Sequence, residues 1–211
     1  MEAFEQFVAV ALEAEGLVVS AAVKFPVRRQ VRKKARIEYQ EHGYEVDLVG
    51  ARSDRLVLAS VKSFFGSGGA KACEVTGRSG DVGLYRLLND PELREAVVAK
   101  AAERYGYQKE QVYLRLYVGK FAGKKGSDEA LVRAWCETQR VGAGPIVVVE
   151  LRRLVEQVRI TAARRTYINN PVLVSMKVLA AVGLLEMKRP VTLPDPAMLD
   201  EGASLEDEGK S

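Results

Sequence analysis

The segment from Tyr44 to Ser63, YEVDLVGARSDRLVLASVKS, constrains the fold more than any other part of the chain. Its alternation of apolar and polar residues predicts two short strands joined by a tight turn. Side chains two apart on a strand share a face, so Glu45 is expected beside Asp47, and Ser60 beside Lys62. The opposite faces are expected to be apolar, with Tyr44, Val46 and Leu48 on the first strand and Val57, Ala59 and Val61 on the second. An acidic pair near a lysine on an apolar hairpin is costly unless it is paired or binds a ligand, which makes this cluster a candidate metal site.

The composition indicates one well-packed core, or one domain with an appendage, because 47% of the 211 residues are apolar and 28% are charged. The apolar runs are too short to span a bilayer, and the amino terminus MEAFEQF lacks a basic leader region, so a cytoplasmic protein without a membrane partner is expected. Two cysteines and one histidine cannot form a four-ligand zinc site or a disulfide framework. Cys73 and Cys136 are expected to be small buried groups, and His42 to be structural.

Charge is distributed unevenly along the chain. The whole sequence has a net formal charge of +4, but residues 1–189 contain 31 basic and 22 acidic residues, a net charge of +9. A basic body of this kind suits a polyanionic partner. Basic residues gather in a predicted hairpin tip and in the glycine-rich stretch that follows the second strand, and those expected to contact nucleic acid are Arg28, Arg29, Arg32, Lys33, Lys34, Arg36, Lys71 and Arg78. A solvated hairpin tip without a ligand is the alternative.

The order of the predicted elements indicates an α/β fold with a mixed central sheet flanked by helices. A helix is followed by a three-strand meander in which His42 and Gly43 form an additional turn, and then by helices and strands in alternation. Pro91 marks a fresh helix start, and the apolar run PIVVVEL predicts a strand buried on both faces. The expected helices cover 3–15, 84–105, 127–138, 152–163 and 170–182, and the expected later strands cover 111–121 and 145–151.

Three regions are expected along the chain. Residues 1–150 form the α/β core and residues 151–189 a helical extension. The acidic, proline-containing segment 190–211 is expected to be disordered. The last predicted helix, NPVLVSMKVLAAV, exposes few polar residues, which favours a core helix or an oligomer contact such as a homodimer interface over a base-reading helix.

Three motifs along residues 3–65 give the chain a family resemblance. The first helix, FEQFVAVALEAEG, contains Glu5, the motif GYEVDLVG contains Glu45 and Asp47, and LVLASVK ends in Lys62. In this order they resemble the PD-(D/E)XK nuclease superfamily, whose fold is called restriction-endonuclease-like. The similarity is greatest to the small resolvase-type members, such as archaeal Holliday-junction resolvases and the YraN-like proteins.

The resemblance implies a metal-dependent DNA endonuclease that hydrolyses phosphodiester bonds in repair, recombination or defence, on double-stranded or branched DNA. Asp47 and Glu5 would ligate Mg²⁺ or Mn²⁺, and Glu45 would be an auxiliary ligand. Lys62 would stabilise the attacking water or the scissile phosphate. Carboxylates that hold Mg²⁺ both activate water and stabilise phosphate charge, which agrees with this chemistry.

Ser60 departs from the family pattern, which has an acidic residue at this position. Three alternatives remain open at this point. Glu5 or Glu45 completes the site, the site binds metal weakly and needs Mn²⁺ or a partner, or the chain is an inactive descendant that binds nucleic acid or assembles a complex. A further alternative is a protein-interaction subunit whose acidic tail covers the basic face until a partner displaces it.

Overall fold

The computed structural model describes residues 2–33, 36–80, 83–123, 127–164 and 168–187, with side chains for all of these except 29–39. The described part of the chain begins with α1 (Ala3–Ala14), followed by the antiparallel strands β1 (Val18–Lys33), β2 (Arg36–Arg52) and β3 (Arg55–Lys62). The remaining elements, in chain order, are α2 (Ala72–Val75), α3 (Arg86–Asn89), α4 (Pro91–Tyr105), the 3-10 helix η1 (Lys109–Gln111), β4 (Val112–Val118), α5 (Ser127–Thr138), β5 (Arg140–Val141), β6 (Gly144–Pro145), β7 (Val147–Val149), α6 (Leu151–Ala162) and α7 (Pro171–Ala181).

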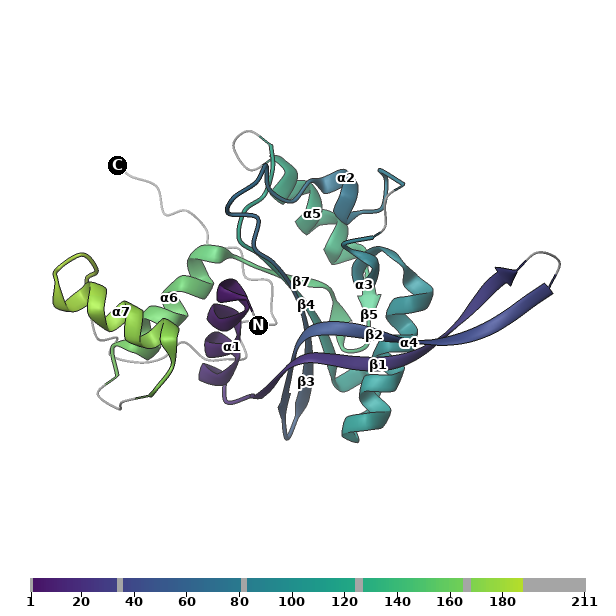
Figure 1. Ribbon diagram of the computed structural model, residues 1–211, viewed down its shortest axis with the longest axis horizontal. Coiled ribbons are helices and arrows are strands. Elements are labelled where there is room, and N and C mark those ends of the chain that lie inside the picture. Colours follow the sequence, from purple (N-terminus) through teal and green to yellow (C-terminus); the bar gives the residue numbers. More distant parts are fainter. Residues whose placement is uncertain (1, 34–35, 81–82, 124–126, 165–167, 188–211) are drawn as a thin grey trace.

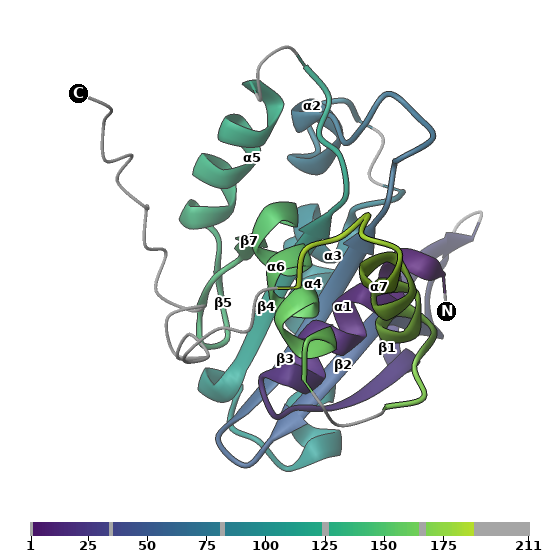
Figure 2. The same ribbon diagram turned by 90° about the vertical axis from the view of Figure 1, so that its left-hand side faces the viewer.

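The centre of the fold is a mixed sheet of five strands in the order β1-β2-β3-β4-β7. β1, β2 and β3 form the expected antiparallel meander, whereas β4 runs parallel to β3 and β7 runs parallel to β4. Helices cover both faces, with α1, α6 and α7 on one side and α3, α4 and α5 on the other (Figure 2). The expected α/β class, with a mixed sheet flanked by helices, is confirmed.

Helix α1 forms because its apolar residues recur at helical spacing and its first turn is capped. Phe4, Val8 and Leu12 are buried against the sheet and the C-terminal helices. Each fully buried side chain of this size contributes about 1.5–3 kcal/mol. The sequence-based helix over 3–15 therefore agrees with α1 to within one residue.

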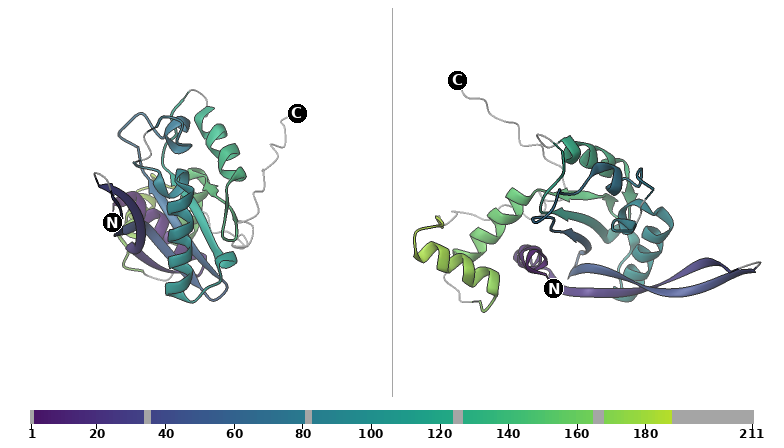
Figure 3. Two further views of the ribbon diagram at one scale, coloured as in Figure 1. Left: turned by 90° about the vertical axis from the view of Figure 1, so that its right-hand side faces the viewer. Right: turned by 45° about the horizontal axis from the view of Figure 1, so that its top comes forward.

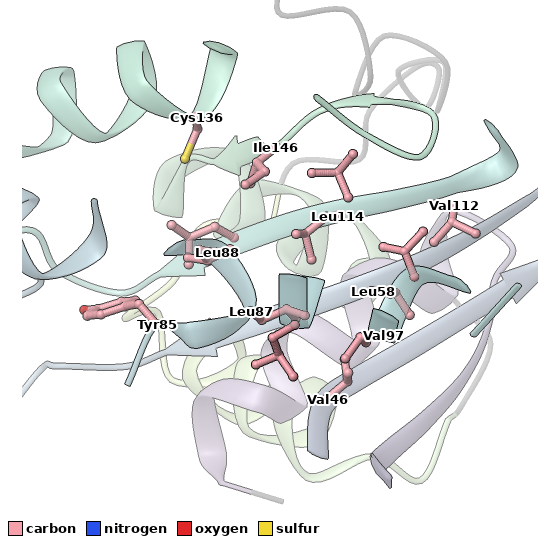
Figure 4. Packing of buried hydrophobic residues seen from close by; sticks show 14 of the residues in the cluster. Val46, Leu58, Tyr85, Leu87, Leu88, Val97, Val112, Leu114, Cys136 and Ile146 are labelled. Atoms are coloured by element: carbon pink, nitrogen blue, oxygen red, sulfur yellow. The ribbon is translucent and has the colours of Figure 1, made fainter. Parts of the chain in front are cut away.

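The opposite face of the sheet holds the larger apolar cluster (Figure 4). Val46, Leu58 and Leu114 extend from the strands toward Leu88 and Val97 of the covering helices. This cluster packs α4 across the sheet and thereby anchors the part of β1, β2 and β3 that lies in the body of the molecule.

Pro91 starts a new helix, as the sequence predicts. The Asp90 side chain caps α4 by accepting a hydrogen bond from the Leu93 amide at 3.1 Å, and Pro91 occupies the first turn, where no backbone donor is needed. At the other end, Gly106 closes the helix with φ +76°, a left-handed conformation that favours glycine.

Strand β2 is much longer than the sequence indicates. His42 and Gly43 were expected in a turn, but they pair with Val27 and Pro26 of β1 within one continuous ribbon. The expectation of a turn there is wrong because the two residues have paired backbone on the opposite strand, and local residue types do not reveal this pairing. The tight turn expected within 44–63 is present between β2 and β3, where Arg52 and Arg55 both contact Asp54.

The prediction that Tyr44, Val46 and Leu48 share one face is also wrong. Val46 belongs to the cluster under α4, whereas Leu48 belongs to the cluster under α1. The change of face occurs between the register pairs Val23–Val46 and Ala21–Leu48, where Ala22 of β1 has φ +52° and the strand alternation is interrupted. On β3 the alternation is regular, and Val57, Ala59 and Val61 do share one face, as expected.

Of the smaller expectations, those for β7 and Cys73 are corrected, whereas the last helix contributes to the core, which is one of the two roles expected for it. β7 lies at the edge of the sheet and only its central residue, Val148, is buried, so the strand is not covered on both faces. Cys136 is buried as expected, but Cys73 is exposed. The helices α6 and α7 contribute Leu154 and Leu173 to the same apolar cluster as α1. The expected tail at 190–211 lies outside the described residues.

Within the described residues, no helix combines the length and the apolar character that crossing a membrane would require.

Candidate functional site

Asp47 lies at the point where β2 leaves β3. The backbone pairing of these strands ends at Leu48 with Ala59, although β3 continues to Lys62. The Asp47 carboxylate takes the place of the missing backbone acceptor, because its Oδ2 accepts a hydrogen bond from the Val61 amide at 2.6 Å. A side chain that replaces a ladder bond is held in a fixed position, which is a property that a functional group requires.

Lys62 and Ser60 converge on the same carboxylate oxygen. The Lys62 Nζ lies 3.2 Å from Asp47 Oδ2, and the Ser60 hydroxyl lies 3.5 Å from it. The side chains of Asp47 and Lys62 are 24% and 20% exposed, so this ion pair is partly screened from water and remains reachable from it. The sequence-based expectation that Asp47 and Lys62 lie together agrees with this geometry, which is equally that of a cross-strand ion pair without a ligand.

The strand ends next to Lys62 are closely packed. The Gly119 amide donates to the Lys62 carbonyl at 2.8 Å, which joins the ends of β3 and β4. A Cβ at Gly119 would lie 2.3 Å from the Ser63 carbonyl oxygen and 2.6 Å from Cζ of Phe65. No side chain fits there, and this restricts the direction in which the chain leaves β3 beyond Lys62.

The amino end of α1 is held beside this exit from β3. Phe4 and Phe65 make an edge-to-face contact with their ring centroids 5.2 Å apart. Glu5, however, uses its carboxylate to accept a hydrogen bond from the Glu2 amide at 2.9 Å, and the reciprocal bond to the Glu2 side chain completes a capping box. The expected ligand Glu5 therefore has a structural role as a helix cap in this conformation.

Glu45 faces a different partner from the one that a metal site would need. It lies opposite Lys24 in the register, and its carboxylate is 3.6 Å from the Lys24 Nζ on the exposed side of the ribbon. In the part of the chain that the structure describes, no group of three or more His, Cys, Asp or Glu side chains is placed to hold a metal ion. The expected three-carboxylate set of Glu5, Glu45 and Asp47 is thus not assembled in this conformation.

The expected nucleic-acid contacts fall on two parts of the molecule. Most lie on the ribbon of β1 and β2, where Arg28 is exposed. The structure gives backbone positions only for the ribbon residues Arg29, Arg32, Lys33 and Arg36. Lys34 lies outside the described residues. Lys71 precedes α2 and forms an ion pair with Glu74 at 2.8 Å, which raises the Lys71 pKa, and Arg78 is exposed in the glycine-rich stretch.

A buried ion pair under α1 was not predicted. Arg115 in β4 is fully buried, and its guanidinium donates to both carboxylate oxygens of Glu15, at 2.8 and 3.0 Å. One signal was visible in the sequence, because Arg115 is the single charge in the strand VYLRLYV. Its partner could not be predicted, since Glu15 is 100 residues away along the chain. The pair fixes the carboxyl end of α1 against the sheet and thereby supports the helix that borders the site.

Comparisons of the chain with protein-family models, curated proteins and solved structures found no match.

Proposed function

We propose that this protein is a metal-dependent DNA endonuclease with a restriction-endonuclease-like fold. The observation that carries the proposal is the pairing of Asp47 with Lys62, 3.2 Å apart, where β2 and β3 separate. The order of one helix, three antiparallel strands, a helical layer and a parallel strand supports the resemblance drawn from the motifs. An acid and a lysine on adjacent strands are groups that phosphodiester hydrolysis can use.

The residues present fit a magnesium site only in part. Asp47 Oδ2 has three donors, whereas no described residue donates to Oδ1, which is therefore the oxygen available to a cation. Mg²⁺ is commonly held by one or two carboxylates together with waters and substrate phosphates. We therefore expect metal to bind weakly alone and more tightly with DNA. When bound, the metal would neutralise phosphate charge and activate water.

Lys62 is the second group in the proposed chemistry. Its ammonium lies beside Asp47 at the end of β3, so it can interact with a phosphate oxygen that approaches this edge of the sheet. Ser60 contributes a neutral hydroxyl in place of a negative charge, and its side chain is 5% exposed. With one carboxylate in place, the described site holds less negative charge than a two-carboxylate site would.

A cleavage assay tests the proposal directly. Supercoiled, branched and single-stranded DNA would be incubated with the protein in Mg²⁺ or Mn²⁺, and cutting should require the metal. Asp47→Asn should reduce the rate by at least about 100-fold, because it removes the one carboxylate at the site. Glu13→Gln, on the exposed side of α1, is the matched control and should cut like the parent. Equal cutting by both variants would refute the assignment of Asp47.

A catalytically silent nucleic-acid-binding module is the second candidate. The observation that favours it is Ser60 together with the capping role of Glu5, which leaves Asp47 as the single carboxylate that the described residues bring to the site. Substitution Ser60→Asp separates the two candidates. It would place two carboxylates together, so the protein should melt at a lower temperature without metal and regain stability with Mn²⁺.

Mn²⁺ binding and DNA cleavage by the Ser60→Asp protein together decide between the two candidates. If the parent does not cut DNA and the variant binds Mn²⁺ and cuts, the chain is a silent descendant of a nuclease site. If the parent cuts and the variant is no better, the single-carboxylate site is sufficient. A variant that neither binds Mn²⁺ nor cuts would contradict a metal site between β2 and β3.

A further inference from the structure

A long two-stranded arm projects from the body of the molecule (Figures 1 and 3). β1 and β2 stay paired out to Lys33 with Arg36, whereas β3 pairs with β2 only between Leu48 and Arg52. Beyond that point no strand among the described residues pairs with the ribbon as a third strand. We define the arm as residues 28–41, because it begins immediately beyond the last positions that the body covers.

The root of the arm is fixed on α4. The Arg104 guanidinium lies over the Phe25 ring, 5.8 Å from its centroid, and also donates to the Lys24 carbonyl at 3.2 Å. Val27 is 3% exposed, whereas the next register pair, Arg28 with Glu41, is exposed. The direction of the arm is therefore set by the body, and its backbone is presented to a partner.

The arm carries as much net charge as the entire chain. Its 14 residues include six basic and two acidic side chains, a net formal charge of +4, which equals the value for all 211 residues. Five of the six basic residues lie within eight positions of the tip sequence, from Arg29 to Arg36. An isolated two-stranded ribbon is marginally stable in water, so the arm gains most from a partner that neutralises this charge.

We propose that the arm binds in the major groove of B-form DNA and supplies a large part of the affinity for the duplex. This inference deepens the proposed function and rests on it for the nucleic-acid partner. The backbones of a two-stranded ribbon lie about 4.8 Å apart, and such a ribbon fits a major groove about 12 Å wide. From the pair Arg28–Glu41 to the pair Lys33–Arg36 the arm extends about 17 Å, the rise of about five base pairs.

Other nucleic acids suit the arm less well. Single-strand binders present several aromatic rings on which bases stack, but the arm contains one aromatic residue, Tyr39. The major groove of A-form RNA is deep and narrow, which excludes a ribbon of this width. Charge and ribbon shape together therefore favour a DNA duplex.

The arm and the candidate site are separated along β2. Glu41 precedes Asp47 by six residues and Arg36 precedes it by eleven, which corresponds to about 20 and 37 Å along an extended strand. A straight duplex would place these contacts about 6 to 11 base pairs from the site. Neutralising the tip should therefore weaken DNA binding while the cleavage rate at saturating DNA stays unchanged.

The test compares two charge-neutralised variants of the full chain. Arg32→Gln with Lys33→Gln removes two charges from the arm, and Arg140→Gln with Arg152→Gln removes two exposed charges from the body. Binding to a 30-base-pair DNA is measured by fluorescence anisotropy across a salt series. Each lost phosphate contact should lower the slope of log K against log salt by about 0.9, so the arm variant should lose about 1.8. Relative to 1 M salt this corresponds to about 60-fold weaker binding at 0.1 M.

The outcomes separate this inference from the proposed function. If the parent binds DNA and the arm variant loses affinity well beyond the body variant, the inference is supported. If both variants bind equally, or if single-stranded DNA or double-stranded RNA binds more tightly than the DNA duplex, the groove assignment is overturned while nucleic-acid binding stands. If the parent binds no nucleic acid, the proposed function fails, and the arm is left to an acidic protein partner. Far-UV circular dichroism of each variant confirms that it is folded.

Discussion

Substitution Arg115→Met should destabilise the fold strongly. Arg115 is fully buried in β4, and the Glu15 side chain that it contacts at 2.8 Å is 4% exposed. Methionine preserves much of the aliphatic volume but leaves the Glu15 carboxylate buried without its cation. Removing one partner of a buried ion pair commonly costs about 3–5 kcal/mol, because the remaining charge keeps its desolvation penalty.

The expected loss is large enough to measure in two ways. In urea titrations followed by circular dichroism, the unfolding free energy should fall by about 3–5 kcal/mol without a change in slope. A chain of 211 residues loses about 2–4 °C of melting temperature per kcal/mol, which gives a decrease of about 6–20 °C. Both measurements use the complete protein.

A double substitution and a surface control make the reasoning refutable. Glu15→Leu together with Arg115→Met removes both charges, so this protein should regain most of the lost stability and lie within about 2 kcal/mol of the parent. Lys24→Met breaks an exposed pair, in which Lys24 is 68% exposed, and should change stability by less than about 0.5 kcal/mol. If Arg115→Met behaves like Lys24→Met, or if the double variant is no more stable than Arg115→Met alone, the pair does not anchor α1.

Two further predictions concern packing and thiol chemistry. Gly119→Ala should destabilise the protein by about 1–3 kcal/mol, because the added methyl group overlaps the chain where it leaves β3. The control Gly144→Ala places its methyl group in open space and should change the stability by less than about 0.5 kcal/mol. Equal melting temperatures of the two variants would contradict the close packing where the chain leaves β3. Burial raises the pKa of the Cys136 thiol to about 12, whereas Cys73 is exposed. At pH 8 the native protein should therefore react with one equivalent of a thiol reagent, at Cys73, and with a second equivalent only after denaturation. Rapid reaction of two equivalents in the native state would refute the burial of Cys136.

Local signals in the sequence were sufficient for most of the fold. The helical spacing of Phe4, Val8 and Leu12 predicted α1, and Pro91 marked the start of α4. The alternating residues of β3 predicted the strand and the shared face of Val57, Ala59 and Val61. These features depend on neighbours within one or two turns or along one strand, so periodicity and capping residues identify them.

The features that sequence reasoning missed depend on distant contacts or on backbone conformation. The left-handed φ of Ala22 has no glycine to indicate it, and it lies where β1 and β2 pass from the pair Val23–Val46 to the pair Ala21–Leu48, at which the buried face changes. The partner of Arg115 lies on another element. At the candidate site, the motifs placed Asp47 beside Lys62 but not the hydrogen bond from the Val61 amide, which depends on where β2 leaves its neighbour.

The candidate site also could not be completed from residue types. A glutamate in the first turn of a helix suits both a metal site and a capping box, and the structure has Glu5 in the second role. The same ambiguity applies to Glu45, whose carboxylate pairs across the ribbon with Lys24. Which of two compatible roles a carboxylate adopts is decided by three-dimensional neighbours that a single sequence does not contain.

The ribbon that forms the arm gives the protein a length that can vary independently of its body. Adding one residue to β1 and one to β2 at the same register level of the arm would keep the pairs Val23–Val46 and Ala21–Leu48 intact and extend the reach by about 3.4 Å. An insertion in β2 alone, between Asp47 and Leu48, would instead shift the carboxylate away from the Val61 amide. Arms of different lengths could therefore arise on an unchanged body, provided that changes come in matched pairs across the two strands.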